Sequence, residues 1–290
     1  MTDAPTPHHL IDLPDGRRLA VDEVGPADGP VVVLLHSAPG SRLFDPDPAV
    51  TAAAEIRLVT LDRPGYGAST ALGDGAVPTI AGQADDVVAA LDHLGVDGAA
   101  LAGWSAGGRV AVGVAARHPE RVRALAVIGT PAPDDLSWIP EEQQAMLEPL
   151  RADPVTATAR LAEILEQAVG GDPADGLGFV AGPGDEELLT DRPVRDRVVT
   201  MLTEAFRPGA DGTAADVVAD QIAEWGFDPA SVGTPVHLFY SEDDFVRPSH
   251  GDWWAEALVD STTHVTSGVG HLLVVTEWAA VLAALGHPAH

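Results

Sequence analysis

Short apolar runs alternate with amphipathic helical patterns over the first 130 residues of this 290-residue chain. Residues 31–35 and 56–61 are predominantly apolar, as expected of strands that are buried on both faces. Residues 79–94 then place Val87 and Leu91 on one face of a predicted helix. This alternation predicts an α/β fold with a mostly parallel central sheet flanked by helices.

The strand signals stop at Thr130 and resume at Val236. Between them, apolar residues fall in three sets, each on one face of a predicted helix. The sets are Leu161, Ile164, Leu165 and Val169; Val194, Val198, Met201 and Leu202; and Val218, Ile222 and Trp225. We therefore expect a core domain of residues 1–130 and 234–290, with residues 131–233 inserted as a helical cap (lid).

The charge balance narrows the range of partners. Sixteen cationic residues, all of them Arg, face 44 acidic ones, which gives a formal net charge of −28. Nucleic acids and anionic membranes are held mainly by Lys and Arg, so we expect the chain to bind neither. The absence of Cys excludes disulfides and thiolate metal sites. Because no basic segment followed by an apolar stretch opens the sequence, a cytoplasmic location is expected.

Residues 103–107 read GWSAG and match the G-x-S-x-G pattern of a nucleophile turn. The pattern lies between a predicted strand at 99–102 and a predicted helix at 106–118. Glycines permit a sharp turn there, and the helix N-terminus favours negative charge that develops beside Ser105. A serine hydroxyl becomes a good nucleophile only beside a base that a third group orients, so a histidine and a carboxylate are expected nearby.

Four short motifs resemble those of the α/β-hydrolase superfamily. They are HSAPG at 36–40, DRPGYGAS at 62–69, GWSAGG at 103–108 and the Gly270-His271 pair, in the order that the superfamily has. The resemblance covers most of the chain outside the helical insertion. It implies the α/β-hydrolase fold and a serine hydrolase of the esterase or proline-iminopeptidase-like branch.

The resemblance also implies which residues carry the chemistry. Ser105 corresponds to the nucleophile and His271 to its base. The acid is expected after the strand at 236–240, where alignment on the superfamily's GxxDxxxP segment selects Asp244. The alternatives that remain are Asp243, Asp134 and Asp135.

The oxyanion of the reaction is expected to bind the backbone N–H of Ala106 and, by the resemblance, that of Ala38. Substrate-pocket candidates are the side chains beside the catalytic loops or at the cap: Ser37, Phe44, Trp104, Trp138, Phe245 and Leu272. Ser37 stands where the superfamily's HGxPG loop has its first glycine. The acidic runs at 45–48 and 185–187 are interpreted as solvated loop charges, and no metal site is expected.

These features predict a serine hydrolase of carboxylesterase or lactonase type that cleaves small or medium esters through an acyl-enzyme, without a cofactor. The alternatives are a proline iminopeptidase-like aminopeptidase, a cofactor-free acyltransferase, perhydrolase or lyase, and a non-catalytic binding protein. The expected partner is a small, neutral ester, lactone or amide. The sequence leaves the natural substrate and the oligomeric state open.

Overall fold

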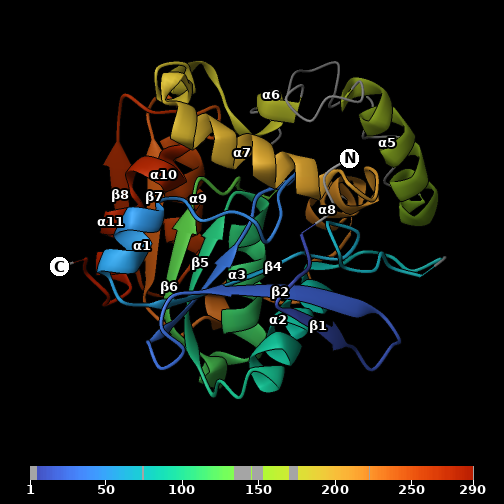
Figure 1. Ribbon diagram of the computed structural model, residues 1–290, viewed down its shortest axis with the longest axis horizontal. Coiled ribbons are helices and arrows are strands. Elements are labelled where there is room, and N and C mark those ends of the chain that lie inside the picture. The colour runs from blue at the N-terminus through green and yellow to red at the C-terminus, as the bar shows by residue number, and fades with distance from the viewer. Residues whose placement is uncertain are drawn as a thin grey trace.

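A single sheet forms the centre of the computed structural model, which describes residues 5–73, 75–133, 145, 153–169, 176–221 and 223–289. Its strands are β1 (His9–Asp12), β2 (Arg18–Val24), β3 (Val31–Leu35), β4 (Arg57–Leu61), β5 (Ala99–Trp104), β6 (Val122–Ile128), β7 (Val236–Ser241) and β8 (Ser261–Thr266). Their order in space is β1-β2-β4-β3-β5-β6-β7-β8 (Figure 1). The pairs β1/β2 and β2/β4 are antiparallel, and the other neighbours are parallel. The predicted mostly parallel sheet is thus confirmed.

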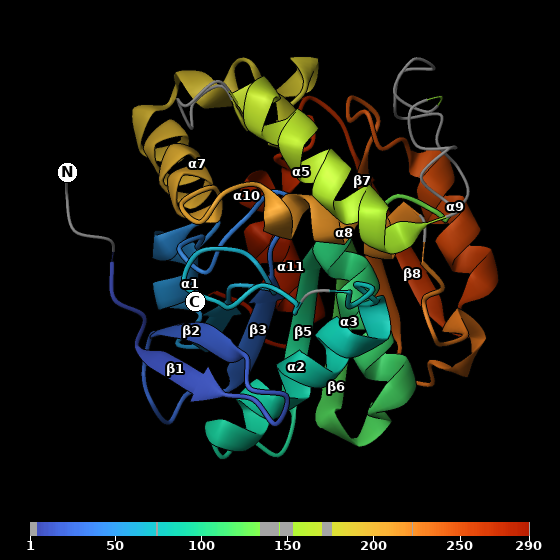
Figure 2. The same ribbon diagram turned by 90° about the vertical axis from the view of Figure 1, so that its right-hand side faces the viewer.

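Helices cover both faces of this sheet (Figures 1 and 2). They are α1 (Pro48–Ala53), α2 (Ile80–His93), α3 (Ala106–Arg117), α9 (Pro248–Ala257), α10 (Leu273–Thr276) and α11 (Trp278–Ala284). Successive side chains of a strand point to opposite faces. On β3, Val33 and Leu35 pack in a cluster with α2, α3 and α9, whereas Val32 and Leu34 pack in a second cluster with α10 and α11. The continuous apolar run of β3 therefore reflects burial on both faces.

Some helix boundaries differ from the prediction. The helix predicted at 272–285 is divided at Glu277 into α10 and α11. The acidic run at 45–48 contains the unpredicted start of α1, because the Asp47 side chain accepts the backbone N–H groups of Ala49 and Val50. Asp45 accepts the Thr51 hydroxyl at 2.7 Å, and burial raises its pKa. The interpretation of this run as solvated charge is therefore wrong for Asp45.

A block of helices separates β6 from β7 in the sequence and lies over the carboxyl ends of the strands (Figures 1 and 2). Its longer described helices are α5 (Pro154–Val169), α6 (Leu177–Val180), α7 (Arg192–Ala205) and α8 (Asp211–Gln221). Trp225 was expected on the same helical face as Val218, but α8 ends before it. Its ring instead stacks on Trp254 of α9, with 5.6 Å between ring centroids, because the chain has turned back toward the core. No helix among the described residues is long and apolar enough to cross a bilayer.

Buried ion pairs join the helical block to the core. Asp216 of α8 pairs with Arg63 and accepts the Tyr66 hydroxyl at 2.7 Å. Glu204 of α7 pairs with Arg42. All five side chains are buried. Because a buried charge without its partner is costly, these pairs fix α7 and α8 against the loops that follow β3 and β4.

Replacing Asp216 tests this anchoring. Asp216→Asn keeps the side-chain shape but leaves the Arg63 guanidinium without its paired carboxylate. We expect the free energy of unfolding, measured by urea denaturation, to fall by about 3–5 kcal/mol. The control is Asp196→Asn, which breaks an exposed ion pair with Arg192 on α7 and should cause no measurable loss. Equal stability of the two variants would contradict the anchoring role of Asp216.

Candidate active site

Ser105 occupies the sharp turn between β5 and α3, where its motif predicts it. Its backbone has φ 55° and ψ −124°, a conformation that residues other than glycine rarely adopt. Two hydrogen bonds hold it there: Ser105 N–H donates to the Ile128 carbonyl, and the Thr130 hydroxyl donates to the Ser105 carbonyl, each at 2.8 Å. Neighbouring strands and loops thus keep the serine at the carboxyl edge of the sheet.

Two glycines permit the close packing beneath this turn. A Cβ atom at Gly103 would lie 2.6 Å from the backbone nitrogen of Gly108. One at Gly107 would lie 2.7 Å from the carbonyl oxygen of His36 and closer still to that of Leu35. These spaces are too small for any side chain, so the glycines of the motif are required for β3, β5 and α3 to meet under Ser105.

A continuous chain of hydrogen bonds joins Ser105, His271 and Asp244. The distance from Ser105 Oγ to His271 Nε2 is 2.9 Å, and His271 Nδ1 lies 2.9 and 3.1 Å from the two Asp244 carboxylate oxygens. An ionised carboxylate can only accept, so Nδ1 carries the proton and Nε2 is left to accept the serine hydroxyl. Both His271 and Asp244 are buried. This is the geometry in which a neutral histidine can remove a proton from Ser105.

The structure brings Asp244, and not its neighbour, to the histidine. Asp243 is exposed, and its carboxylate accepts the backbone N–H of Gly268 at 2.6 Å. Asp244 accepts the Val246 N–H at 3.0 Å in addition to facing His271. The other two alternatives, Asp134 and Asp135, lie outside the described residues.

The loop at 36–40 lies beside the nucleophile turn and is held by hydrogen bonds from Arg63. The Arg63 guanidinium donates to the carbonyl groups of His36 and Ser37. Burial and the Arg63 charge hold the pKa of His36 well below its ordinary value, so this imidazole is neutral. The Ser37 hydroxyl donates to the Pro39 carbonyl at 2.6 Å, which occupies it inside the loop. Ala38 is half-buried in this loop, and Ala106 is the first residue of α3.

The aromatic pocket candidates lie close to His271. The Trp104 indole N–H donates to the His271 carbonyl at 2.9 Å, and its ring stacks on Phe44 with 5.2 Å between centroids. Both of these residues are buried in the core. The half-buried Phe245 ring lies 4.3 Å from the imidazole, centroid to centroid. Leu272 is fully buried next to His271. Trp138 lies outside the described residues.

Sequence reasoning missed Asp185. Its run at 185–187 was interpreted as solvated charge, which holds for the exposed Glu186 and Glu187 but is wrong for Asp185. Asp185 has no exposed surface, and its carboxylate accepts the backbone N–H groups of Gly270 and Leu272 on either side of His271. The signal that could have drawn attention to it is the Gly182-Pro183-Gly184 segment just before it, since glycines mark close backbone approach.

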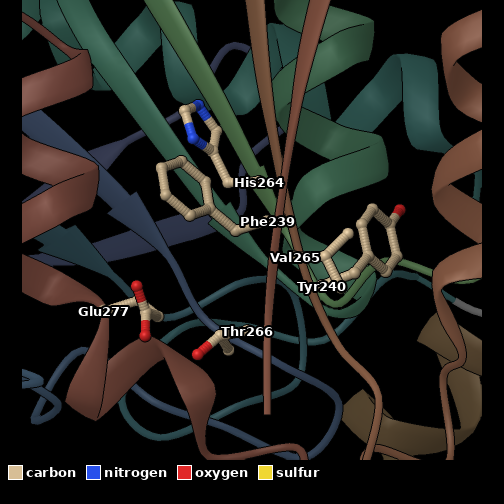
Figure 3. Close-up of a pocket in the computed structure, with 6 residues that line it drawn as sticks. All are labelled: Phe239, Tyr240, His264, Val265, Thr266 and Glu277. Carbon is tan, nitrogen blue, oxygen red and sulfur yellow. The ribbon is translucent and has the colours of Figure 1, made fainter.

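A separate hollow of about 140 Å³ lies at the β7–β8 edge of the sheet. Figure 3 shows its six lining residues, with the rings of Phe239 and His264 on one side of the strand pair and Tyr240 on the other. None of the candidate catalytic residues lines it. Among the described residues, no three His, Asp or Glu side chains gather as metal ligands would.

Comparison with known proteins places the chain among relatives of the same fold. The sequence model of the α/β hydrolase fold family matches residues 30–277. A pimeloyl-[acyl-carrier protein] methyl ester esterase of Aromatoleum aromaticum is 30% identical over 248 residues, which are 83% of this chain and 91% of that protein. The acetyltransferase component of the acetoin cleaving system of Pseudomonas putida is 40% identical over 119 residues, which are 40% of this chain and 30% of that protein.

A solved structure gives the same result for the fold. The crystal structure of a hydrolase from Pseudomonas aeruginosa PA01 matches with a TM-score of 0.72 and 24% identity, over 96% of this chain and 98% of that one. The family resemblance predicted from the four motifs is thus confirmed. The family match and the esterase relative together show that the chain is a hydrolase enzyme that belongs to the α/β hydrolase fold family.

Proposed function

We propose that this chain is a serine hydrolase that cleaves small or medium, neutral carboxylic esters or lactones through an acyl-enzyme on Ser105. The observation that carries the proposal is the hydrogen-bonded chain from Ser105 through His271 to Asp244 at the nucleophile turn. The 30% identical esterase relative supports the ester class. A lactone is a cyclic ester, and the same chemistry opens it.

Acylation begins when Ser105 Oγ attacks the carbonyl carbon of the substrate and His271 Nε2 takes the hydroxyl proton. Asp244 keeps the imidazole in the required tautomer and stabilises its charged form. The tetrahedral oxyanion accepts hydrogen bonds from the N–H groups of Ala106 and Ala38. When the intermediate collapses, the carbon–oxygen bond to the leaving group breaks, and His271 gives its proton to the departing alcohol.

Deacylation repeats these steps with water. His271 takes a proton from the water molecule as its oxygen attacks the acyl carbon. The second tetrahedral intermediate collapses, the ester bond to Ser105 breaks, and the serine recovers its proton from His271. The carboxylic acid then leaves, and no cofactor takes part in these steps.

The preference for neutral substrates rests on charge. The chain carries a formal net charge of −28. The buried Arg63 guanidinium beneath the 36–40 loop is already occupied by Asp216 and by two backbone carbonyl groups. It therefore offers no charge to a substrate carboxylate, and the surrounding negative field disfavours an anionic ester.

Replacing the nucleophile is the first test. Ser105→Ala should lower kcat for p-nitrophenyl butyrate by about four to six powers of ten, because the hydroxyl that forms the acyl-enzyme is gone. Circular dichroism should show an unchanged fold, and the control Ser249→Ala, at an exposed serine of α9, should keep full activity. Activity of Ser105→Ala above about 1% of the parent would contradict the assignment.

The class of scissile bond is tested with two chromogenic substrates. We expect kcat/KM for p-nitrophenyl butyrate to exceed that for proline p-nitroanilide, because the 30% identical relative that covers most of the chain is an esterase. A reversed preference would replace the esterase with the proline iminopeptidase-like alternative. Labelling of Ser105 by a phosphonate without release of p-nitrophenol from the ester or of p-nitroaniline from the anilide would favour the non-hydrolytic alternatives.

The charge preference is tested with p-nitrophenyl butyrate and the anionic p-nitrophenyl hemisuccinate. At low ionic strength we expect kcat/KM to be about tenfold higher for the neutral ester, because the negative field lowers the local concentration of the anion. The ratio should decrease toward physiological salt, where the Debye length is about 8 Å. Equal values at low salt would show that the field does not select the substrate.

A further inference from the structure

The segment Gly182-Pro183-Gly184-Asp185, which we term the GPGD segment, lies against the two loops that carry Asp244 and His271. It belongs to the helical block between β6 and β7 and ends in a short 3-10 helix (Pro183–Asp185). Asp185 Oδ1 accepts the N–H groups of Gly270 and Leu272 at 2.9 and 3.2 Å, and Oδ2 accepts the Gly182 N–H at 2.8 Å. One buried carboxylate thus joins this block to the residues on both sides of His271.

The glycines show how closely the segment approaches these loops. A Cβ atom at Gly184 would lie 2.8 Å from the Gly270 nitrogen and 2.9 Å from the Asp243 carbonyl oxygen. One at Gly270 would lie 2.8 Å from the Asp185 carboxylate carbon. A Cβ at Gly182 would touch the Phe245 ring at 3.3 Å. The GPGD segment therefore packs directly on the loops that carry Asp244 and His271, and no side chain fits at Gly184 or Gly270 without a clash.

The main chain around His271 is consequently held at three points. Asp185 accepts the N–H before and the N–H after this residue, and the Trp104 indole donates to the His271 carbonyl. A backbone fixed on both sides leaves the imidazole little freedom except rotation of its own side chain. That rotation is limited by Asp244 at one ring nitrogen and Ser105 at the other.

The Asp185 charge also acts on the imidazole. Three carboxylates among the described residues bind the His271 loop: Asp244 at the ring, Asp185 at the neighbouring N–H groups and Asp243 at Gly268. Burial raises the pKa of Asp185 above its ordinary value, although its N–H donors and the attraction of a charged His271 oppose this rise. By the same attraction, an ionised Asp185 stabilises the imidazolium that forms during catalysis.

We propose that Asp185 is a positioning residue for His271, through which the helical block between β6 and β7 sets the orientation of the base. This inference rests on the proposed function, in which His271 is the base. Asp185 does not touch the substrate or the reacting atoms. Its effect is expected on kcat rather than on KM, since a misplaced base slows the chemical steps without weakening substrate binding.

Three variants separate this role from general stabilisation. Asp185→Ala removes the acceptor for Gly270 and Leu272. Asp185→Asn removes the charge, keeps one oxygen that can accept the N–H groups of Gly270 and Leu272, and leaves only the Gly182 N–H without its acceptor. Glu186→Gln removes a charge from the adjacent, exposed residue and is the matched control. The amount of folded enzyme is counted by the final extent of phosphonate labelling of Ser105, so that a partly unfolded variant does not lower the apparent kcat.

For p-nitrophenyl butyrate we expect Asp185→Ala to lower kcat by about tenfold to a hundredfold, with KM within about threefold of the parent. Asp185→Asn should recover most of kcat, and the acid limb of its kcat/KM profile should move to lower pH, because a negative charge that favoured the imidazolium is gone. Glu186→Gln should match the parent in all three quantities. If Asp185→Ala does not fold, the test rests on the pH profile of kcat/KM for Asp185→Asn. An acid limb at the same pH as that of the parent then overturns the inference.

A readout that needs no substrate keeps this inference separable from the proposed function. The chain has 11 histidines, and the signals of His271 in a ¹⁵N-histidine NMR spectrum are those that disappear in His271→Gln. We expect Asp185→Asn to shift them and Glu186→Gln to leave them in place. Unchanged signals in Asp185→Asn would overturn the positioning role even if Ser105 proves to be the nucleophile. Conversely, full activity of Ser105→Ala would end the proposed function and leave this measurement valid.

Discussion

The positive-φ backbone of Ser105 is the constraint on which the rest of the site depends. A non-glycine residue in a sparsely populated conformation costs about 1–3 kcal/mol, so it persists only where its surroundings determine it. Here the surroundings are the buried strand β5, the helix α3 and the contacts of Ile128 and Thr130 with the turn. The parallel sheet supplies the remaining partners, since the loops after β7 and β8 reach the same edge as the turn after β5. Asp244 and His271 therefore meet Ser105 although they are far from it in the sequence.

The helical block is bound to this edge by buried carboxylates. Glu204 and Asp216 pair with Arg42 and Arg63, which lie in the loops after β3 and β4. Among the residues that the structure describes, Asp185 forms no ion pair, and its carboxylate accepts backbone N–H groups. The first two carboxylates thus compensate buried positive charge, whereas the third is available to organise main chain next to the base. This division explains why we assign anchoring to Asp216 and positioning to Asp185.

Much of the fold could be predicted because its signals are local. The buried strands are apolar runs, and the nucleophile turn needs small residues at fixed spacing around Ser105. The contacts that sequence reasoning missed are distant in the chain. Asp185 accepts N–H groups of residues 85 and 87 positions away in the sequence. The Trp104 indole donates to a carbonyl group 167 positions away. Sequence periodicity does not reveal such pairs, so the acidic run at 185–187 gives no sign that Asp185 is buried, and Trp104 reads as a pocket residue although it lies in the core. The choice between Asp244 and Asp243 likewise depends on the turn after β7, which a one-residue alignment ambiguity left open.

A crystal structure of the enzyme after reaction with a small neutral alkyl phosphonate tests the central claim most directly, because the adduct imitates the tetrahedral intermediate. We expect the phosphorus atom bonded to Ser105 Oγ, and the phosphonyl oxygen about 2.7–3.1 Å from the backbone nitrogens of Ala106 and Ala38. His271 should remain between the adduct and Asp244. An adduct on another residue, or a phosphonyl oxygen that faces neither N–H group, would contradict the proposed catalytic site.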